Sequence, residues 1–496
     1  MYRFVDAAVV RAAARCPGSV PPWPDLTDDA EKNLTSWVDW LRQVWASDGF
    51  AASVEIASPD LARRVQEVCQ GSRVRRQEVR RAVLSLIRYL LRSTSRATPF
   101  GLFSGVAPVR LGHTPAVRFG GGHRAVARVD STWLDGVITR LEAIPELRYR
   151  LLVVRNNLAF VRDGRLVVGC WQSGAVHGTG PAEVSVRYTE AVHTVFQAAQ
   201  TPVRLGDLAD KLASNFPDKP DSVINEMLTR LVEHRLLVTS LRPPMTVTDP
   251  LGHVIEALTA VQADTVQGAA GLLDELCGIH ADLLHHNATP PLRGRSLRSH
   301  VSRRMAALCT AERPIAVDLR LDGDLVLPHA VVREAERTAE ALARLGPHPH
   351  GTPAWQDYHR RFCERYGLGS LVGIRELLDA DSGLGFPHGY RNSRLAPPSV
   401  PGLSKRDMAL LVLAQNAAVQ QHTEVVIDDA LVDNLAAASL GEYRVQPHTE
   451  LRCRIYSPST GALGRGEFRL AVTGMSRAAG TTAAHGRCAA SGRGSC

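Results

Sequence analysis

A helix that stops before a proline and runs into a strand is the pattern that most constrains the fold of this chain. Before Pro99, apolar residues recur at spacings of three and four, which places them on one stripe of a helix. These residues are Val79, Val83, Leu86, Ile87, Leu90 and Leu91. Pro99 pushes Thr98 away from the helical conformation, and the alternating residues from Gly105 onward predict a strand. The segment therefore predicts a helix, a short loop and a strand in succession.

Arginines occupy a second face of the same helix. The residues on this face are Arg81, Ser85, Arg88 and Arg92. Arg92 and Arg96 come at the helix end, next to the hydroxyl of Thr98. Because a guanidinium offers a planar fork of donors, this junction suits a phosphate or a carboxylate. The alternative interpretation is a basic helix end that is only solvated.

Length and composition describe an ordinary globular protein. A chain of 496 residues is too long for one core, so we expect two to four structural units. It is 45% hydrophobic and 22% charged, as soluble proteins are. No apolar run reaches the roughly 20 residues of a membrane helix, and the N-terminus lacks a signal-peptide core, so we expect a cytoplasmic protein. The net charge of +8 permits an RNA partner without requiring one.

The sequence does not favour a metal site. Its nine cysteines lie singly, and none forms a Cys-x-x-Cys, so we expect free, mostly buried thiols. His348 and His350 alternate in a loop, a pattern that seldom binds metal. Residues 379–383 resemble the start of a calcium loop, but Tyr390 stands where the loop needs its final glutamate, so we expect a turn.

The first 145 residues or so combine helical and strand patterns, which predicts an α+β fold. Thr27–Glu31 reads as a capping box that opens a helix. Further on, three β-rich runs follow one another, and Asp163-Gly164 separates the last two. An Asp-Gly pair between β-rich runs is a strong signal for a hairpin. The runs are 151–154, 158–161 and 165–168.

Residues 147–243 predict a winged helix-turn-helix, because three helical stripes and a short strand follow the hairpin. The stripes are Val192, Val195, Phe196 and Ala199, then Leu205, Leu208 and Leu212, then Val223, Met227, Leu228, Leu231 and Val232. Such a unit commonly binds DNA through its third helix, which then carries a positive face. Here the charges balance. They are Glu226, Arg230, Glu233 and Arg235.

From residue 244 the chain is largely helical and rich in alanine, with one helix expected after Pro328. Residues 481–496 contain no aliphatic side chain larger than alanine and predict a disordered, low-complexity tail. An abrupt loss of core-forming side chains after Gly480 is what a frameshift in a GC-rich gene would produce. We therefore hypothesise a truncated or frameshifted product, whose strands near 450–475 lack partners and expose an edge.

Several motifs, taken together, resemble the N-terminal region of the class I lantibiotic dehydratases. The most specific is Arg92-Ser-Thr-Ser-Arg96-Ala-Thr98-Pro99-Phe100-Gly101-Leu102-Phe103. Others follow in the family's order and extend the resemblance to about residue 480. They are Val129-Asp130-Ser-Thr-Trp133-Leu134, Ala316-Val317-Asp318-Leu319, Phe362-Cys-Glu-Arg-Tyr366-Gly367, Glu376 to Pro387, Gly466-Glu-Phe468-Arg-Leu470 and Ser476-Arg-Ala-Ala-Gly480.

The resemblance implies a reaction. These dehydratases move glutamate from glutamyl-tRNA onto serine or threonine hydroxyls of a precursor peptide, and a separate elimination domain then removes it to leave a dehydroamino acid. It implies glutamyl-tRNA as a co-substrate, with no cofactor and no metal. The positions that match the family's glutamylation residues are Arg92, Arg96, Thr98, Asp130, Asp318 and Arg11. As alternatives, Asp130 is a helix N-cap, Asp318 belongs to a structural salt bridge, and Arg11 is a solvated surface arginine.

The resemblance also implies a domain organisation. Residues 1–146 and 244–480 would form a glutamylation domain, incomplete at its end. Residues 147–243 would form a winged-helix module that binds the precursor's leader as an added strand. The elimination domain is missing, so a separate elimination protein or a homodimer partner is expected. An inactive leader-binding scaffold and a winged-helix DNA-binding regulator are the alternatives to a glutamyl transferase.

Overall fold

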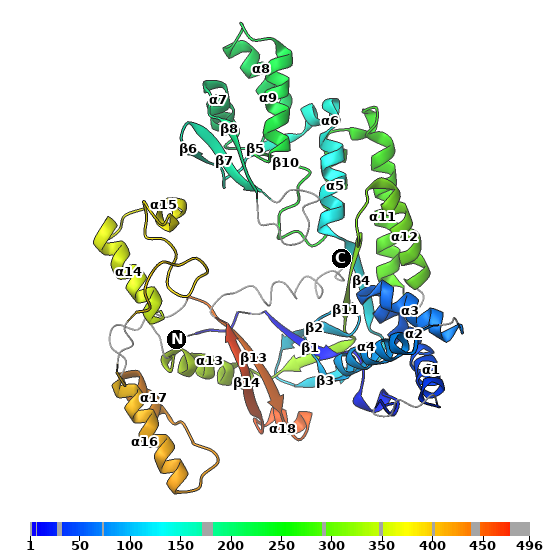
Figure 1. Ribbon diagram of the computed structural model, residues 1–496, viewed down its shortest axis with the longest axis vertical. Helices are drawn as coiled ribbons and strands as arrows, with labels where there is room; N and C mark the ends of the chain where they lie inside the picture. The colour runs from blue at the N-terminus through cyan, green and yellow to red at the C-terminus, as the bar shows by residue number, and fades with distance from the viewer. Residues whose placement is uncertain are drawn as a thin grey trace. The chain divides into compact units, whose positions relative to one another are not determined.

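The chain divides into two compact units, each of which mixes helices and strands (Figure 1). The larger comprises Val9–Pro108 and Arg118–Asp324, and the smaller comprises Met1–Ala8, Val109–Val117 and Leu325–Ala483. The predicted α+β class is confirmed. The computed structural model describes residues 2–5, 7–26, 32–71, 74–170, 182–289, 294–346, 351–398, 402–437 and 447–476.

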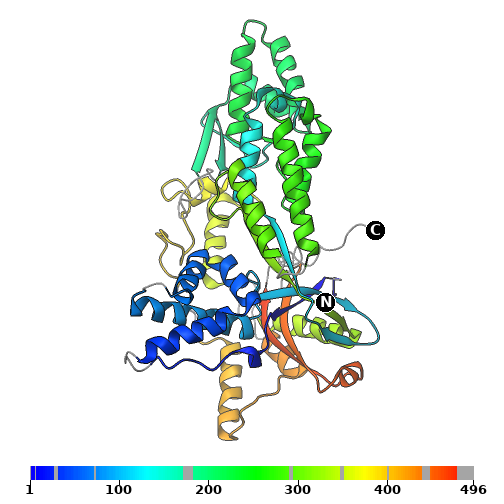
Figure 2. The same cartoon turned by 90° about the vertical axis from the view of Figure 1, so that its right-hand side faces the viewer.

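A helical bundle opens the larger unit, and its four helices lie together in both views (Figures 1 and 2). Trp37, Phe50 and Phe103 are fully buried in its core. The predicted stripe before Pro99 faces this core, except that Leu91 is exposed. The elements are β1 (Ala8–Ala13), the 3-10 helix Pro17–Ser19, α1 (Lys32–Trp45), α2 (Asp48–Ala57), α3 (Pro59–Cys69) and α4 (Arg76–Ser95).

A sheet follows α4 directly. Strand β2 pairs with β1 and, in parallel, with β11, where Val106 lies opposite Arg320. Strand β11 pairs on its other side with β4 in antiparallel register, with Asp318 opposite Val126. The strands are β2 (Ser104–Leu111), β3 (Ala116–Phe119), β4 (Arg124–Val129) and β11 (Ile315–Arg320).

Long helices complete this part of the larger unit. In both views α11 and α12 run side by side (Figures 1 and 2). The Asn287 side chain of α11 pairs with the backbone of Ala127, donating to its carbonyl at 3.0 Å and accepting from its N–H at 2.7 Å. The helices are α5 (Ser131–Glu142), α6 (Pro145–Arg150), α10 (Pro250–Ala260), the 3-10 helix Ala263–Thr265, α11 (Ala270–Ala288) and α12 (Gly294–Leu308).

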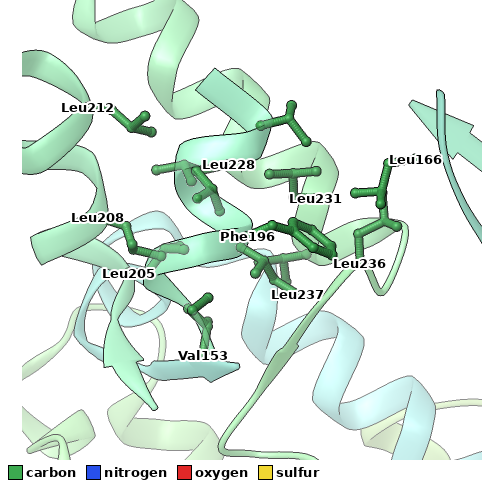
Figure 3. Packing of buried hydrophobic residues seen from close by; sticks show 14 of the residues in the cluster. Val153, Leu166, Phe196, Leu205, Leu208, Leu212, Leu228, Leu231, Leu236 and Leu237 are labelled. Atoms are coloured by element: carbon green, nitrogen blue, oxygen red, sulfur yellow. The ribbon is translucent and has the colours of Figure 1, made fainter. Parts of the chain in front are cut away.

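Residues 152–239 contain the elements that the sequence predicts there. The hairpin between β6 and β7 turns at Asp163 and Gly164, whose φ angles of 50° and 69° belong to a type I′ turn. Three helices then pack around one apolar core that includes Phe196, Leu208 and Leu228 (Figure 3). The elements are β5 (Leu152–Arg155), β6 (Phe160–Arg162), β7 (Arg165–Cys170), β8 (Ala182–Arg187), α7 (Glu190–Ala198), β9 (Val203–Arg204), α8 (Leu205–Asn215), α9 (Asp221–Glu233) and β10 (Leu237–Thr239).

The smaller unit is mainly helical. Its strand β12 pairs in parallel with the end of β2, and the helix expected after Pro328 is present as α13. Residues 379–383 form the expected turn, in which Asp379 accepts hydrogen bonds from Asp381 and Ser382. The elements are β12 (Gly323–Leu327), α13 (His329–Arg344), α14 (Pro353–Tyr366), α15 (Ile374–Leu378), α16 (Lys405–Val419), α17 (Asp429–Ala437), β13 (Glu450–Tyr456), α18 (Thr460–Gly464) and β14 (Arg469–Ser476).

Two predictions need correction. The strands expected to lack partners near 450–475 pair with each other, as β13 and β14. The cysteines expected to be mostly buried are exposed or half-buried where the structure describes them, at positions 16, 69, 277, 309, 363 and 453.

The capping box at 27–31, the histidines at 348 and 350, and the tail at 481–496 lie outside the described residues. Among the described helices, none is long and apolar enough to cross a membrane.

Candidate active site at the end of helix α4

Helix α4 ends in a turn whose hydroxyl groups bond back to the helix. Ser93 donates to the carbonyl of Leu90 at 2.7 Å, and Ser95 donates to that of Leu91 at 2.5 Å. Arg96 follows as an extended C-cap residue, with its N–H bonded to the carbonyl of Arg92 at 3.1 Å. The helix thus ends where the sequence predicts, and it leaves two guanidinium groups at its C-terminal end.

Arg92 lies over an aromatic ring. Its guanidinium carbon is 4.4 Å from the centroid of the Phe100 ring. Phe100 in turn stacks on the buried Phe103 at 6.0 Å, and Phe103 stacks on Tyr89 at 5.0 Å. An arginine held on a ring in this way gains cation–π energy and loses rotational freedom. The Thr-Pro-Phe-Gly motif therefore fixes the direction in which Arg92 points.

Arg92 also has unused hydrogen-bonding capacity. Its Nη2 donates to the carbonyl of Thr98 over a long 3.4 Å, and its Nε is buried with no partner among the described residues. Burial lowers the pKa of Arg92, and the neighbouring charge of Arg96 lowers it further. A cation that is partly desolvated and unsatisfied in this way is ready to bind an anion.

The loop after Arg96 is tied to the sheet below it. The Ser104 hydroxyl, fully buried at the start of β2, donates to the same Thr98 carbonyl, while Thr98 itself is exposed. At the next position β2 lies very close to β11, since a Cβ on Gly105 would stand 2.4 Å from the carbonyl oxygen of Leu319. Leu319 directly follows Asp318. Ser104, which holds the loop after Arg96, and Asp318 thus lie on the adjacent strands β2 and β11.

Asp318 forms the salt bridge that the sequence left as an alternative. Its Oδ2 is 2.8 Å from Nη2 of Arg128, on the neighbouring strand β4, and both side chains are partly exposed. Asp130 likewise adopts its alternative role, because its Oδ1 accepts the N–H of Thr132 at 2.8 Å and so caps α5. These contacts hold both carboxylates in fixed positions.

The six expected site residues lie on connected elements of the larger unit. Arg92 and Thr98 are in contact, and Asp318 and Asp130 belong to adjacent strands or their ends. Arg11 is half-buried on β1, the other strand that pairs with β2. Arg96 is exposed and has no ion pair with a described residue, so its expected approach to Asp130 or Asp318 stays a prediction.

Three residues that complete this arrangement received no role from the sequence. They are Phe100, Ser104 and Arg128. Phe100 was visible within the Thr-Pro-Phe-Gly motif, and Arg128, near the end of β4, stands two residues before Asp130. Ser104 carried no signal, because its bond to Thr98 depends on how the loop folds back.

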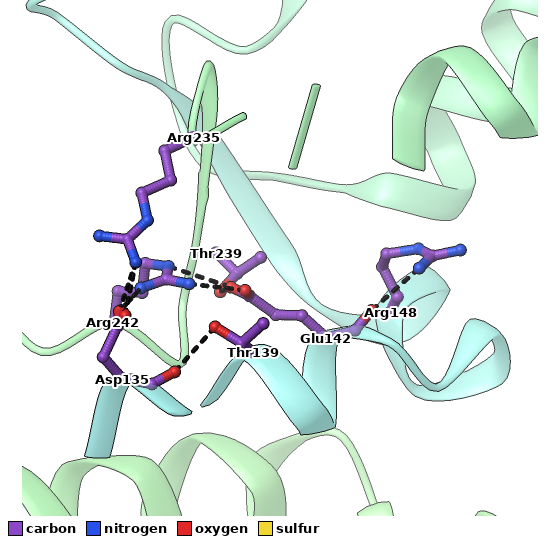
Figure 4. A network of polar contacts seen from close by, with 7 residues as sticks. All are labelled: Asp135, Thr139, Glu142, Arg148, Arg235, Thr239 and Arg242. Atoms are coloured by element: carbon purple, nitrogen blue, oxygen red, sulfur yellow. Dashed lines mark hydrogen bonds and ion pairs between the residues drawn. The ribbon is translucent and has the colours of Figure 1, made fainter. Parts of the chain in front are cut away.

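A second group of arginines joins residues 235–242 to α5 (Figure 4). Arg242 donates to both Asp135 and Glu142, at 2.6 Å and 2.7 Å, and Arg235 donates to Asp135 at 2.6 Å. Glu142 is buried, and it also accepts from the hydroxyl of Thr239 at 2.6 Å. Burial opposes the charge of Arg242, but Glu142 and Asp135 outweigh it and raise the pKa of Arg242. We call these five residues the α5 joint.

Comparison with known proteins relates this chain to one family. Residues 46–490 match the family described as lantibiotic dehydratase, N terminus. The subtilin biosynthesis protein SpaB of Bacillus subtilis is 25% identical over 374 residues, which cover 74% of this chain and 35% of SpaB. The nisin biosynthesis protein NisB of Lactococcus lactis subsp. lactis is 20% identical over 409 residues, which cover 82% of this chain and 40% of NisB. The chain therefore spans well under half the length of these relatives.

Two solved structures are similar to this one. The crystal structure of the tRNA dependent lantibiotic dehydratase MibB from Microbispora sp. 107891 is 31% identical with a TM-score of 0.76, covering 95% of this chain and 44% of MibB. The glutamylation domain of TbtB, from thiomuracin biosynthesis, shares the fold at 18% identity and a TM-score of 0.54, covering 89% of this chain and 54% of TbtB. Since the family match covers most of its length, the chain belongs to the lantibiotic dehydratase family and corresponds to the N-terminal region of its members.

Proposed function

We propose that this chain transfers glutamate from glutamyl-tRNA to serine or threonine hydroxyls of a ribosomally made precursor peptide. The observation that carries the proposal is Arg92, held on Phe100 with an unsatisfied, partly desolvated guanidinium beside the exposed Thr98. The family to which the chain belongs supports it, as does the 31% identity to a dehydratase described as tRNA dependent.

The reaction develops negative charge, and this site contains two arginines that can stabilise it. The hydroxyl oxygen of the peptide attacks the ester carbonyl of glutamyl-tRNA, a new ester forms, and the terminal ribose hydroxyl of the tRNA leaves with the proton. The carbonyl oxygen becomes negative on the way, and the tRNA end brings phosphates. Arg92 and Arg96 would hold these negative charges, which is effective when the donors are fixed in advance.

The carboxylates have narrower roles in this proposal. Asp318 would accept the hydroxyl proton of the peptide, with Arg128 holding its carboxylate in place at 2.8 Å. Asp130 would act from the N-terminus of α5, where it already caps the helix. Arg11, on the strand that pairs with β2, would contribute a further positive charge.

Residues 147–243 would bind the leader of the precursor peptide as a winged-helix module. Among the described strands β8 pairs with β7 alone, so its other edge can accept an added strand. Val223, which the sequence predicts to face inward on α9, is exposed instead and would offer an apolar contact. On the same helix Arg230 is paired with Glu226 at 2.6 Å, which favours a peptide over DNA as the ligand.

Mass spectrometry tests the proposal directly. The purified chain is incubated with glutamyl-tRNA and a precursor peptide that carries its leader, and uncharged tRNA serves as the control. We expect peptide products heavier by one or more glutamyl residues, only with charged tRNA and in lower yield without the leader. Tight leader binding with no transfer would contradict the transferase and support the leader-binding scaffold instead.

A further inference from the structure

We infer that one face of α4 is the surface that holds the sugar-phosphate backbone of the tRNA and leads its end to Arg92. The inference rests on the proposed function and extends it to a partner surface. Arg81, Arg88 and Arg92 recur along the helix, and Arg96 follows at its C-cap. We call these four residues the arginine stripe.

Helix geometry aligns the stripe. At 3.6 residues per turn, Arg81, Arg88 and Arg92 fall within roughly 40° of one another and span about 16 Å along the axis. The side of α4 that faces the bundle core is apolar instead, with Val83, Leu86 and Leu90 buried. The stripe is therefore a straight row of positive charges on a helix that packing holds rigid.

No carboxylate in the described part of the chain forms an ion pair with the stripe. Arg81, Arg88 and Arg96 are exposed, and within the described part of the chain none has a salt bridge to a carboxylate. The one acidic residue of α4, Glu78, is engaged with Arg64 at 2.9 Å. Elsewhere in this unit arginines are commonly paired, as the α5 joint shows. An unpaired row at one place is thus a local property of α4.

Such a row is unfavourable without a ligand. Like charges one turn apart repel, and here Arg88, Arg92 and Arg96 follow at intervals of four. The lowered pKa of Arg92 has burial as its first cause and this repulsion as its second. A chain of phosphates relieves the repulsion along the whole row, whereas a single carboxylate relieves it at one point. The repeat of the charges therefore favours a nucleic acid backbone as the partner.

The salt dependence of tRNA binding tests this surface. Fluorescently labelled, uncharged glutamate tRNA is titrated with the full chain between about 50 and 300 mM salt, and anisotropy gives Kd. The variants are Arg81→Gln, Arg88→Gln and their double variant. Arg80→Gln is the matched control, because Arg80 is exposed on the same helix but about 100° away from Arg81.

We expect each variant of the stripe to lower the slope of log Kd against log salt by about 0.7 to 0.9, the loss of one phosphate contact. The double variant should bind roughly tenfold more weakly at low salt, and Arg80→Gln should match the wild type. An unchanged slope in the double variant, or an equal loss in Arg80→Gln, would overturn the inference. Equal weakening for a DNA duplex of similar length would mean that the surface is a general polyanion site and contradict a tRNA track.

Failure of this inference and failure of the proposed function give different results. If the wild type binds tRNA with the predicted slope but transfers no glutamate, the surface stands and the transferase does not. If the wild type transfers glutamate and the double variant binds tRNA with an unchanged slope, the transferase stands and the surface does not. Thermal unfolding of each variant should match the wild type, since the replaced side chains are exposed.

Discussion

Arginine side chains have opposite roles in two regions of the larger unit. In the α5 joint, Arg242 lies between Glu142 and Asp135, and their carboxylates raise its pKa against the effect of burial. At the end of α4, Arg92 rests on Phe100 and has no ion pair with a carboxylate among the described residues, and burial together with Arg96 lowers its pKa. The same side chain is thus saturated by the protein in one region and left unsatisfied in the other.

The difference separates a structural arginine from a binding one. A buried charge that the fold needs is surrounded by opposite charges, because an unpaired one would destabilise the native state. A charge meant for a ligand keeps free donors and accepts some loss of stability. Substitutions should therefore affect folding in the α5 joint and ligand binding at the end of α4.

The largest effect on stability should come from Arg242→Ala. The substitution leaves Glu142, whose side chain is only 7% exposed, without its main ionic partner. Removing one partner of a buried ion pair destabilises a protein by about 3–5 kcal/mol. Urea unfolding measures the change. Arg230→Ala is the control, because Arg230 and Glu226 form an exposed pair and its loss should change stability by less than about 1 kcal/mol. Equal effects of the two substitutions would contradict the structural role of the joint.

Gly105→Ala should have the next largest effect, because it acts on the two strands, β2 and β11, that support the loop after Arg96. The new Cβ would lie 2.4 Å from the backbone oxygen of Leu319, so β2 and β11 would have to separate. We expect a loss of about 1–3 kcal/mol of unfolding free energy, the usual range for overpacking. Gly121→Ala, which has open space around it, should be neutral. A neutral Gly105→Ala would mean that the two strands are not held as closely as the structure has them.

Asp130 allows capping and chemistry to be separated. Asparagine caps helices about as well as aspartate, whereas alanine does not, so Asp130→Asn should keep stability and Asp130→Ala should lose about 1 kcal/mol. If Asp130 also contributes its charge to glutamyl transfer, both variants lose activity. Activity retained by Asp130→Asn would assign Asp130 to the cap alone. Thermal unfolding and the glutamylation assay together give the answer.

The smallest effect concerns a pair that titrates. His280 lies 2.6 Å from Asp249, whose hydrogen bond raises the pKa of His280. Since the folded state binds this proton more tightly, the pair stabilises the protein fully below the ordinary histidine pKa of about 6.5, and the gain disappears as pH rises through the raised value. His280→Gln should therefore narrow the difference between unfolding midpoints at about pH 6 and pH 9. An unchanged pH profile would show that the pair does not titrate in this range.

Local patterns in the sequence predicted much of the fold. Asp163-Gly164 gave the hairpin, the apolar stripes gave α4 and α7 to α9, and Pro99 placed the end of α4 within a few residues. Each of these depends on residues close together in the chain. For Asp130 the sequence offered two roles, and the local one, the helix cap, is the one that the structure contains.

Contacts between distant residues could not be predicted in this way. Arg242 and Glu142 are 100 residues apart, and Arg128 and Asp318 are 190 apart, so no spacing rule links them. The stacking of Arg92 on Phe100 depends on the loop folding back over Phe103. The prediction of mostly buried cysteines is wrong because it rests on the average burial of cysteine. The surroundings of each cysteine determine its exposure.

Arg92→Ala tests the central claim most directly, provided that unfolding and glutamylation are measured on the same preparation. We predict at least a hundredfold loss of tRNA-dependent glutamylation, the range for removing one preorganised donor. The free energy of unfolding should change by less than about 1 kcal/mol, because the substitution removes the contact with Phe100 and one long hydrogen bond to the Thr98 carbonyl. A loss of stability as large as that of Arg242→Ala, or glutamylation that survives the substitution, would contradict the assignment of this arginine to the substrate.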